Sequence, residues 1–111
     1  MNILEELNTI LGELGFSVET GVFSGQAPDE YVVITPMVDN FPIFADNLPV
    51  LEKQEARISL FSKRNYLKRK KFIVLVLTGL EFTITGQTHV GREDDTGYFH
   101  AAIDVEKCYE F

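Results

Sequence analysis

The chain has one cysteine, few basic residues and no long apolar run, and each of these shortages excludes a class of protein. Cys108 is the only cysteine among the 111 residues, so neither an internal disulfide nor a cysteine-based metal site can form. No apolar run approaches the roughly 18 residues of a membrane-spanning helix, and the first residues include Glu5 and Glu6 but no cation. We therefore expect a soluble protein made in a cytoplasm, with no signal peptide and no membrane partner.

Positive charge is scarce, because 17 acidic residues face 10 basic ones and the net charge is −7. Phosphate binding needs a basic face, so nucleic acid is not expected as the main partner. An acidic surface suits a soluble protein, or one that lines a channel through which DNA slides without sticking. The apolar content of 45%, with nine Phe and four Tyr, is that of a folded chain, and we expect one domain over residues 1–111.

Catalytic and metal-binding patterns are missing as well. The sequence has no P-loop, dinucleotide fingerprint or nucleophile elbow. The run of Glu93, Asp94 and Asp95 falls on a turn, where a convex, wet surface favours solvated carboxylates over acid–base work or cation binding. His89 and His100 fall on two strands of one hairpin, but two histidines without cysteine make a poor metal site. We expect no enzyme, no catalytic residue, no metal and no cofactor.

Periodicity predicts two helices and four or five strands. Apolar residues at three- and four-residue spacing indicate a helix over 1–14, ended by Gly15. Strands are expected where apolar and polar residues alternate, with Pro36 restricting the first long one to a sheet edge or a strand end. The predicted segments are a short strand within 16–23, a loop over 24–30, and strands over 31–37, 51–62, 81–89 and 98–105, the last two joined by a turn over 91–97.

Residues 72–77, FIVLVL, carry conflicting signals because a β-branched run favours a strand. We predict a helix over 66–77, with Asn65 as its N-cap, since basic residues continue it upstream and Gly79 ends it. Such a helix is apolar nearly all round at its C-terminal half, so we expect it to be well covered. The fold class is then α+β, in the order α-β-β-α-β-β, with a mostly antiparallel sheet and two helices packed on one face. The expected core residues of the sheet are Ile58, Leu60, Phe82, Ile84, Phe99 and Ile103, and Cys108 is expected to fill an apolar gap.

Residues 38–50 read as a long irregular loop, since they hold two prolines and several Asp and Asn residues. They also hold apolar side chains, and loops of this length often carry function. Exposed aromatic residues there would form a contact surface for another subunit. The candidate interface residues of this segment are Phe41, Ile43, Phe44 and Leu48.

The only basic cluster lies before and within the start of the second helix. It consists of Lys63, Arg64, Lys68, Arg69, Lys70 and Lys71. Cations near a helix start oppose the helix dipole, so an acidic neighbour could compensate them. Two interpretations stay open: a solvated helix start, or a contact with DNA or with acidic surface of an adjacent subunit. Lys68, Arg69, Lys70 and Lys71 are the candidate interface residues here.

Several segments together resemble the tail-completion proteins of long-tailed bacteriophages, the tail terminator or tail-to-head joining family. They are ILEELNTILGELGF, YVVITP, FADNLP, ARISLFSKRNY with the following helix, and DDTGYFHAAIDVE. The most specific parts are LFSKRNY before the helix and DTGYFH at the start of the last strand. The helix departs from the family pattern, because it is more basic at its start and more β-branched at its end.

The resemblance implies a structural virion protein, assembled in the host cytoplasm, that caps the tail tube as a ring, usually a hexamer. Its partners would be further copies of itself, the tail tube protein and the head-completion or connector protein, with DNA only as passing cargo. Two alternatives stay open. A head-completion (stopper or adaptor) protein of the same virion would form rings on the portal side. A small soluble regulator or nucleic-acid-binding module would be a monomer or dimer with salt-dependent affinity for nucleic acid.

Overall fold

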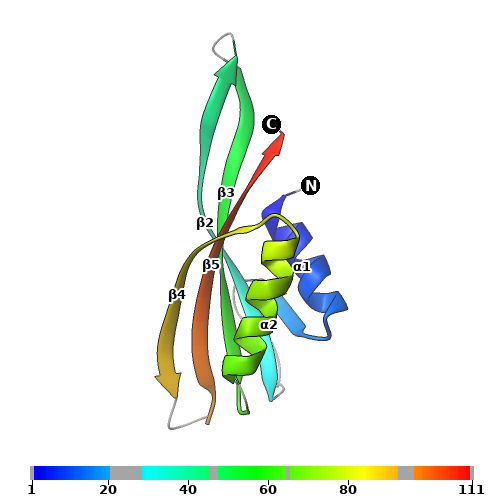
Figure 1. The fold of residues 1–111 in the computed structure, drawn as a ribbon, viewed down its shortest axis with the longest axis vertical. Helices are drawn as coiled ribbons and strands as arrows, with labels where there is room; N and C mark the ends of the chain where they lie inside the picture. Colours follow the sequence, from blue (N-terminus) through cyan, green and yellow to red (C-terminus); the bar gives the residue numbers. More distant parts are fainter. Residues whose placement is uncertain (1, 21–28, 46–47, 65, 93–96, 111) are drawn as a thin grey trace.

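The computed structural model contains two helices and one five-stranded sheet (Figure 1). It describes residues 2–20, 29–45, 48–64, 66–92 and 97–110. The elements, in chain order, are α1 (Ile3–Glu13), β1 (Ser17–Thr20), β2 (Glu30–Ala45), β3 (Leu48–Ser62), α2 (Tyr66–Gly79), β4 (Thr83–Arg92) and β5 (Phe99–Glu110). The predicted α+β class is confirmed, and β1 is the additional short strand expected after the first helix.

The strands lie in the order β1-β2-β3-β5-β4, and only the β1–β2 pair is parallel. Alternation decides which residues of β3 are buried: Ala56, Ile58 and Leu60 point into the core, as predicted, whereas Arg57 is exposed. Both helices pack on that one face of the sheet (Figure 1). The core therefore lies in a single layer between helices and sheet.

Helix α1 forms where the apolar stripe predicts it. Asn2 caps it by accepting a hydrogen bond from the Glu5 backbone N–H at 2.9 Å. The stripe of Ile3, Leu7 and Leu11 is buried, and the helix ends at a left-handed Gly15 with φ of 93°. Leu14 is the C-cap, and Gly15 after it has the left-handed conformation that was predicted.

Helix α2 ends with the same backbone arrangement as α1. The Phe82 N–H donates to the Leu77 carbonyl at 3.0 Å, and the Glu81 N–H to that of Thr78 at 3.3 Å. These are the two bonds of a Schellman motif, and Phe82 is buried as the motif requires. The left-handed position, which Gly15 fills in α1, is occupied here by Glu81 with φ of 73°. A non-glycine residue in that conformation carries a strain of about 1–2 kcal/mol.

The prediction of a helix rather than a strand over 72–77 is confirmed. The expectation that the rest of the protein covers this helix on most sides is wrong. Only one stripe of α2 is buried, consisting of Lys70, Ile73 and Leu77. Leu67 and Leu75 point outward, because the sheet can cover only about one face of a helix. Cys108 was also placed wrongly: it lies exposed on β5 rather than in an apolar gap.

Of the six sheet residues expected in the core, four are buried there. Phe99 is half-buried and lies outside the main core. Ile84 is partly buried and packs against the main core. The N-cap predicted at residue 65 falls outside the described residues. The loop predicted over 24–30 is described only at residues 29 and 30, and Glu30 already belongs to β2. Of the turn predicted over 91–97, residues 93–96 fall outside the described residues, and Gly91 and Arg92 belong to β4.

The loop predicted for residues 38–50 is wrong, because strands β2 and β3 run through it as a long antiparallel hairpin. The two prolines that suggested a loop lie at irregularities of the ladder. Pro42 lies within the shift between Asn40 and Ile43, and Pro49 pairs with Phe44 beside the shift between Ile43 and Phe44. Pro36, just before this segment, also precedes a register shift. A proline lacks the N–H that a regular ladder needs, and a bulge removes that need. Strand β2 consequently continues to Ala45 instead of ending near Pro36.

Candidate functional site

A hairpin arm, residues 39–54, is the most distinctive feature of the molecule. It extends beyond both helices (Figure 1), and the molecule measures 54 × 27 × 24 Å as a result. Strand β5 pairs with β3 along the base of the arm, and this pairing ends at Leu51–Glu110. Beyond that pair, from Ile43 on β2 to Leu51 on β3, the described sheet has only two strands. An isolated two-stranded ribbon is marginally stable in water, so this end of the arm is suited to pack against something else.

The base of the arm is fixed to α1 by one buried side chain. Gln54 accepts a hydrogen bond from the Ile3 N–H at 2.8 Å and donates one to Glu52 at 2.6 Å. The Ile3 N–H is one of the donors that a helix start leaves without an intrahelical acceptor. Gln54 thus joins the first turn of α1 to the arm and holds the direction in which the arm leaves the body.

The two segments that carry the family resemblance pack against each other at the other end of the sheet. On the helix-free face, the Phe61 ring stacks on Tyr31 at 4.8 Å and on His100 at 4.2 Å between centroids, across three neighbouring strands. Tyr98 closes this cluster edge-on at 5.4 Å from Tyr31. The residues of LFSKRNY and DTGYFH in this cluster therefore share a packing role.

On the helix face, Tyr66 stacks on Phe99 with the centroids 4.9 Å apart. Lys70 is buried, and its ammonium lies 3.1 Å from Nε2 of His89. An ammonium can only donate, so this imidazole nitrogen accepts the bond. These contacts hold the start of α2 against β4 and β5, and both ring nitrogens of His89 lie within reach of side chains of α2.

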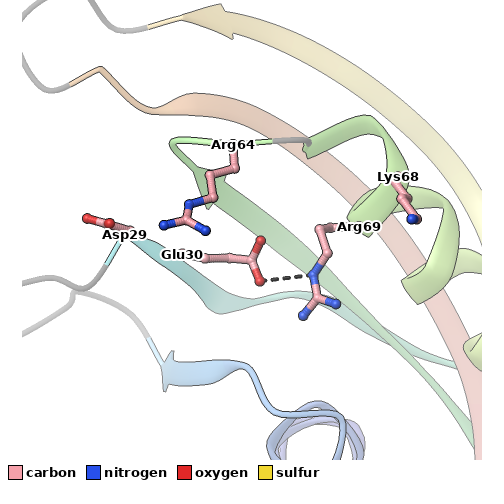
Figure 2. A pocket seen from close by; sticks show the side chains of 5 residues that line it. All are labelled: Asp29, Glu30, Arg64, Lys68 and Arg69. Atoms are coloured by element: carbon pink, nitrogen blue, oxygen red, sulfur yellow. Dashed lines mark hydrogen bonds and ion pairs between the residues drawn. The ribbon is translucent and has the colours of Figure 1, made fainter.

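A pocket of about 420 Å³ opens where β2 begins, β3 ends and α2 starts. Its lining residues are Asp29, Glu30, Arg64, Lys68 and Arg69. Figure 2 shows Arg64 and Arg69 on either side of Glu30, with Lys68 on the helix farther from Glu30. Arg69 donates to Glu30 at 2.9 Å and lies over the Phe16 ring at 4.4 Å. Arg69 therefore connects α2 to β2 and to the end of α1.

Ser62 completes this network from beneath. Its fully buried hydroxyl donates to Glu30 at 3.2 Å and accepts a bond from the Arg64 N–H at 3.2 Å. Both carboxylate oxygens of Glu30 are thus occupied by protein donors, so the pocket presents an ion-paired carboxylate rather than a general base. Within the described residues, no three side chains of the metal-ligating types come together.

A second concave surface, the α2–β4 groove, lies on the outer side of α2. It has a volume of about 410 Å³ and is lined by Leu67, Lys70, Lys71, Val74, Leu75 and Gln87. Leu67 is 52% exposed and Leu75 62% exposed, which is unusual for apolar residues on a helix that packs against a sheet. The sequence contained a signal for this groove. Leu67 and Leu75, eight residues apart, lie on a helix face other than that of the buried Ile73 and Leu77, so they form a second apolar stripe.

The residues predicted as an interface fall on two separate surfaces. Phe41, Ile43, Phe44 and Leu48 all belong to the hairpin arm. The basic residues are divided by α2 itself: Lys68 and Arg69 line the charged pocket, whereas Lys70 and Lys71 line the groove. The basic cluster is therefore not one patch. Sequence reasoning missed Leu67, Leu75 and Glu30, the last because its partner is 39 residues away.

No protein-family model matches this chain, and no curated protein matches it in sequence. Among the described residues, neither helix is long and apolar enough to cross a membrane. The function is therefore inferred from the residues and from their arrangement.

Proposed function

We propose that this protein is a structural component of a bacteriophage tail, a tail terminator that caps the tail tube as a ring and forms the interface to the head. The observation that carries the proposal is the hairpin arm: a long two-stranded projection on a small α+β body, in which seven of the eleven residues 41–51 are apolar. Beyond the pair Leu51–Glu110 the described arm is a two-stranded ribbon, which is marginally stable alone, and assembly would supply a further packing partner.

The two most specific segments of the resemblance support the same proposal. They meet on both faces of the sheet, where Phe61 stacks on His100 on the helix-free face and Tyr66 stacks on Phe99 under the start of α2. When the members of a family share a fold but no active site, the residues that they have in common are expected to be packing residues. The proposed role is accordingly structural and not enzymatic.

Charge is consistent with a ring around passing DNA. The chain carries a net charge of −7, and a lumen lined by carboxylates does not retain a phosphate backbone. The ring would be a hexamer, as in the family that the sequence resembles, with the tail tube protein on one side and the head connector on the other.

The test is deletion of the gene from the phage or prophage that encodes it, followed by electron microscopy of the lysate. We expect tails of abnormal length, or heads and tails that accumulate separately. Tails of normal length joined to heads would contradict the proposal.

Two double variants then ask whether the arm is responsible. Phe41→Asp with Phe44→Asp should reproduce the deletion phenotype in a protein that still folds. Thr35→Asp with Met37→Asp is the matched control, since both positions are exposed, on the same strand, before the arm. Circular dichroism and gel filtration establish that each purified variant is folded.

A further inference from the structure

The α2–β4 groove has the features of a docking site for an apolar strand. Leu67 and Leu75 line it from the helix, 52% and 62% exposed, and Gln87 lines it from β4. A contiguous set of large exposed apolar residues is rare on a soluble protein unless it meets a partner. Most of β4 is exposed along its length, so the strand contributes little cover to this side of the molecule.

Strand β4 is also a free edge of the sheet. It is last in the strand order, and among the described residues its only ladder partner is β5. An edge strand has unpaired backbone donors and acceptors on its outer side, which a strand from another chain can pair with. The groove thus offers apolar side chains from the helix and backbone hydrogen bonds from the edge.

The hairpin arm has the chemistry that fits this groove. Over residues 39–54 its charged residues are Asp39, Asp46, Glu52 and Lys53, so the arm has a net negative charge. The groove contributes Lys70 and Lys71, and none of the described residues that line it is acidic. An acidic, apolar ribbon and a basic, apolar groove are complementary in both respects.

One copy cannot bring the two surfaces together. In Figure 1 the arm points upward beyond both helices, whereas α2 begins and β4 ends at the opposite end of the sheet. The register of β3 with β5, from Leu51–Glu110 to Ser62–Phe99, holds the arm in that direction. The fitting occupant is therefore the arm of a second copy.

From these observations we infer that the hairpin arm of each copy docks in the α2–β4 groove of the next copy. Because each copy passes its arm to the next copy instead of exchanging arms with one partner, the contact is head-to-tail and generates a closed ring or a filament. Closure into a ring rests on the proposed function, whereas the arm–groove contact itself does not depend on any role in a phage.

The contact can be tested by cross-linking two purified single-cysteine proteins. Both carry Cys108→Ser, which removes the exposed native thiol. One has Phe44→Cys in the arm and the other Leu75→Cys in the groove. They are mixed at millimolar concentration with a short bismaleimide. Leu80→Cys replaces Leu75→Cys in the control, because Leu80 is also a leucine, is 44% exposed and does not line the groove.

We expect the arm–groove pair to give about tenfold more mixed dimer than the control pair, because docking raises the local concentration of the two thiols. Adding Lys71→Glu to the groove protein should lower that yield, and Asp46→Lys in the arm protein should restore it. Equal yields from the two pairs, or an arm–arm dimer as the main product, would overturn the inference.

The result also separates the contact from the proposed function. An arm–groove dimer, with normal tails in the deleted phage, would support the contact and reject the tail role. Defective tails in the deleted phage without an arm–groove dimer would reject the contact and leave the tail role standing.

Discussion

Leu75 and Leu77 offer a direct check of helix α2, because the same residue type lies two positions apart with opposite burial. Leu77 is fully buried, and Leu75 is 62% exposed. Truncating a buried leucine to alanine costs about 2–5 kcal/mol, through lost burial and the cavity left behind. Exposed positions away from special features change stability by about 0.5 kcal/mol or less. We therefore expect Leu77→Ala to destabilise the protein strongly and Leu75→Ala to have almost no effect.

The assay is urea unfolding of both variants beside the native protein, with comparison of midpoints at unchanged slope. In a helix, residues two apart point about 200° around the axis from each other, so their burial differs; in a strand they share a face. Equal losses of unfolding free energy for Leu75→Ala and Leu77→Ala would therefore refute the helix. A larger loss for Leu75→Ala would refute the orientation of α2 on the sheet.

Three further predictions concern single side chains. Burial and the hydrogen bond to Glu6 raise the pKa of the Tyr109 hydroxyl in the folded protein. The unfolded chain therefore loses this proton at a lower pH than the folded protein, and the unfolding free energy falls as pH rises above about 10. Tyr109→Phe should weaken that fall, measured by urea unfolding at several pH values. Gln54→Ala leaves the Ile3 N–H without its acceptor and should cost about 1–3 kcal/mol in the same assay, whereas no loss would mean that Gln54 does not anchor the arm. Glu81→Gly relieves the left-handed strain and should raise the unfolding free energy by up to about 1 kcal/mol, and a loss would contradict the Schellman assignment.

Local patterns predicted the elements that bury one regular face. The stripe of α1, the alternation of β3 and the choice of helix for 72–77 follow from periodicity and end signals, and the structure confirms all three. These features depend on residues within a few positions of each other. A single sequence contains that information.

The hairpin arm and the groove could not be predicted in the same way. Pro42 and Pro49 indicate a loop by local rules, and only the partner strand shows that both lie at interruptions of the ladder. Glu30 binds Arg69 across 39 positions, and no local pattern pairs them. The exposure of Leu75 depends on which face of α2 the sheet covers, which is a property of the whole fold.

The measurement that tests the proposed tail role most directly is the position of the protein on separated virus parts. An epitope-tagged copy would be located with gold-labelled antibody on free tails from a lysate that makes no heads, and on heads from a lysate that makes no tails. A tail terminator predicts one label cluster at one end of each free tail and none on the heads. Label on tailless heads with unlabelled tails would contradict the account and assign the protein to head completion.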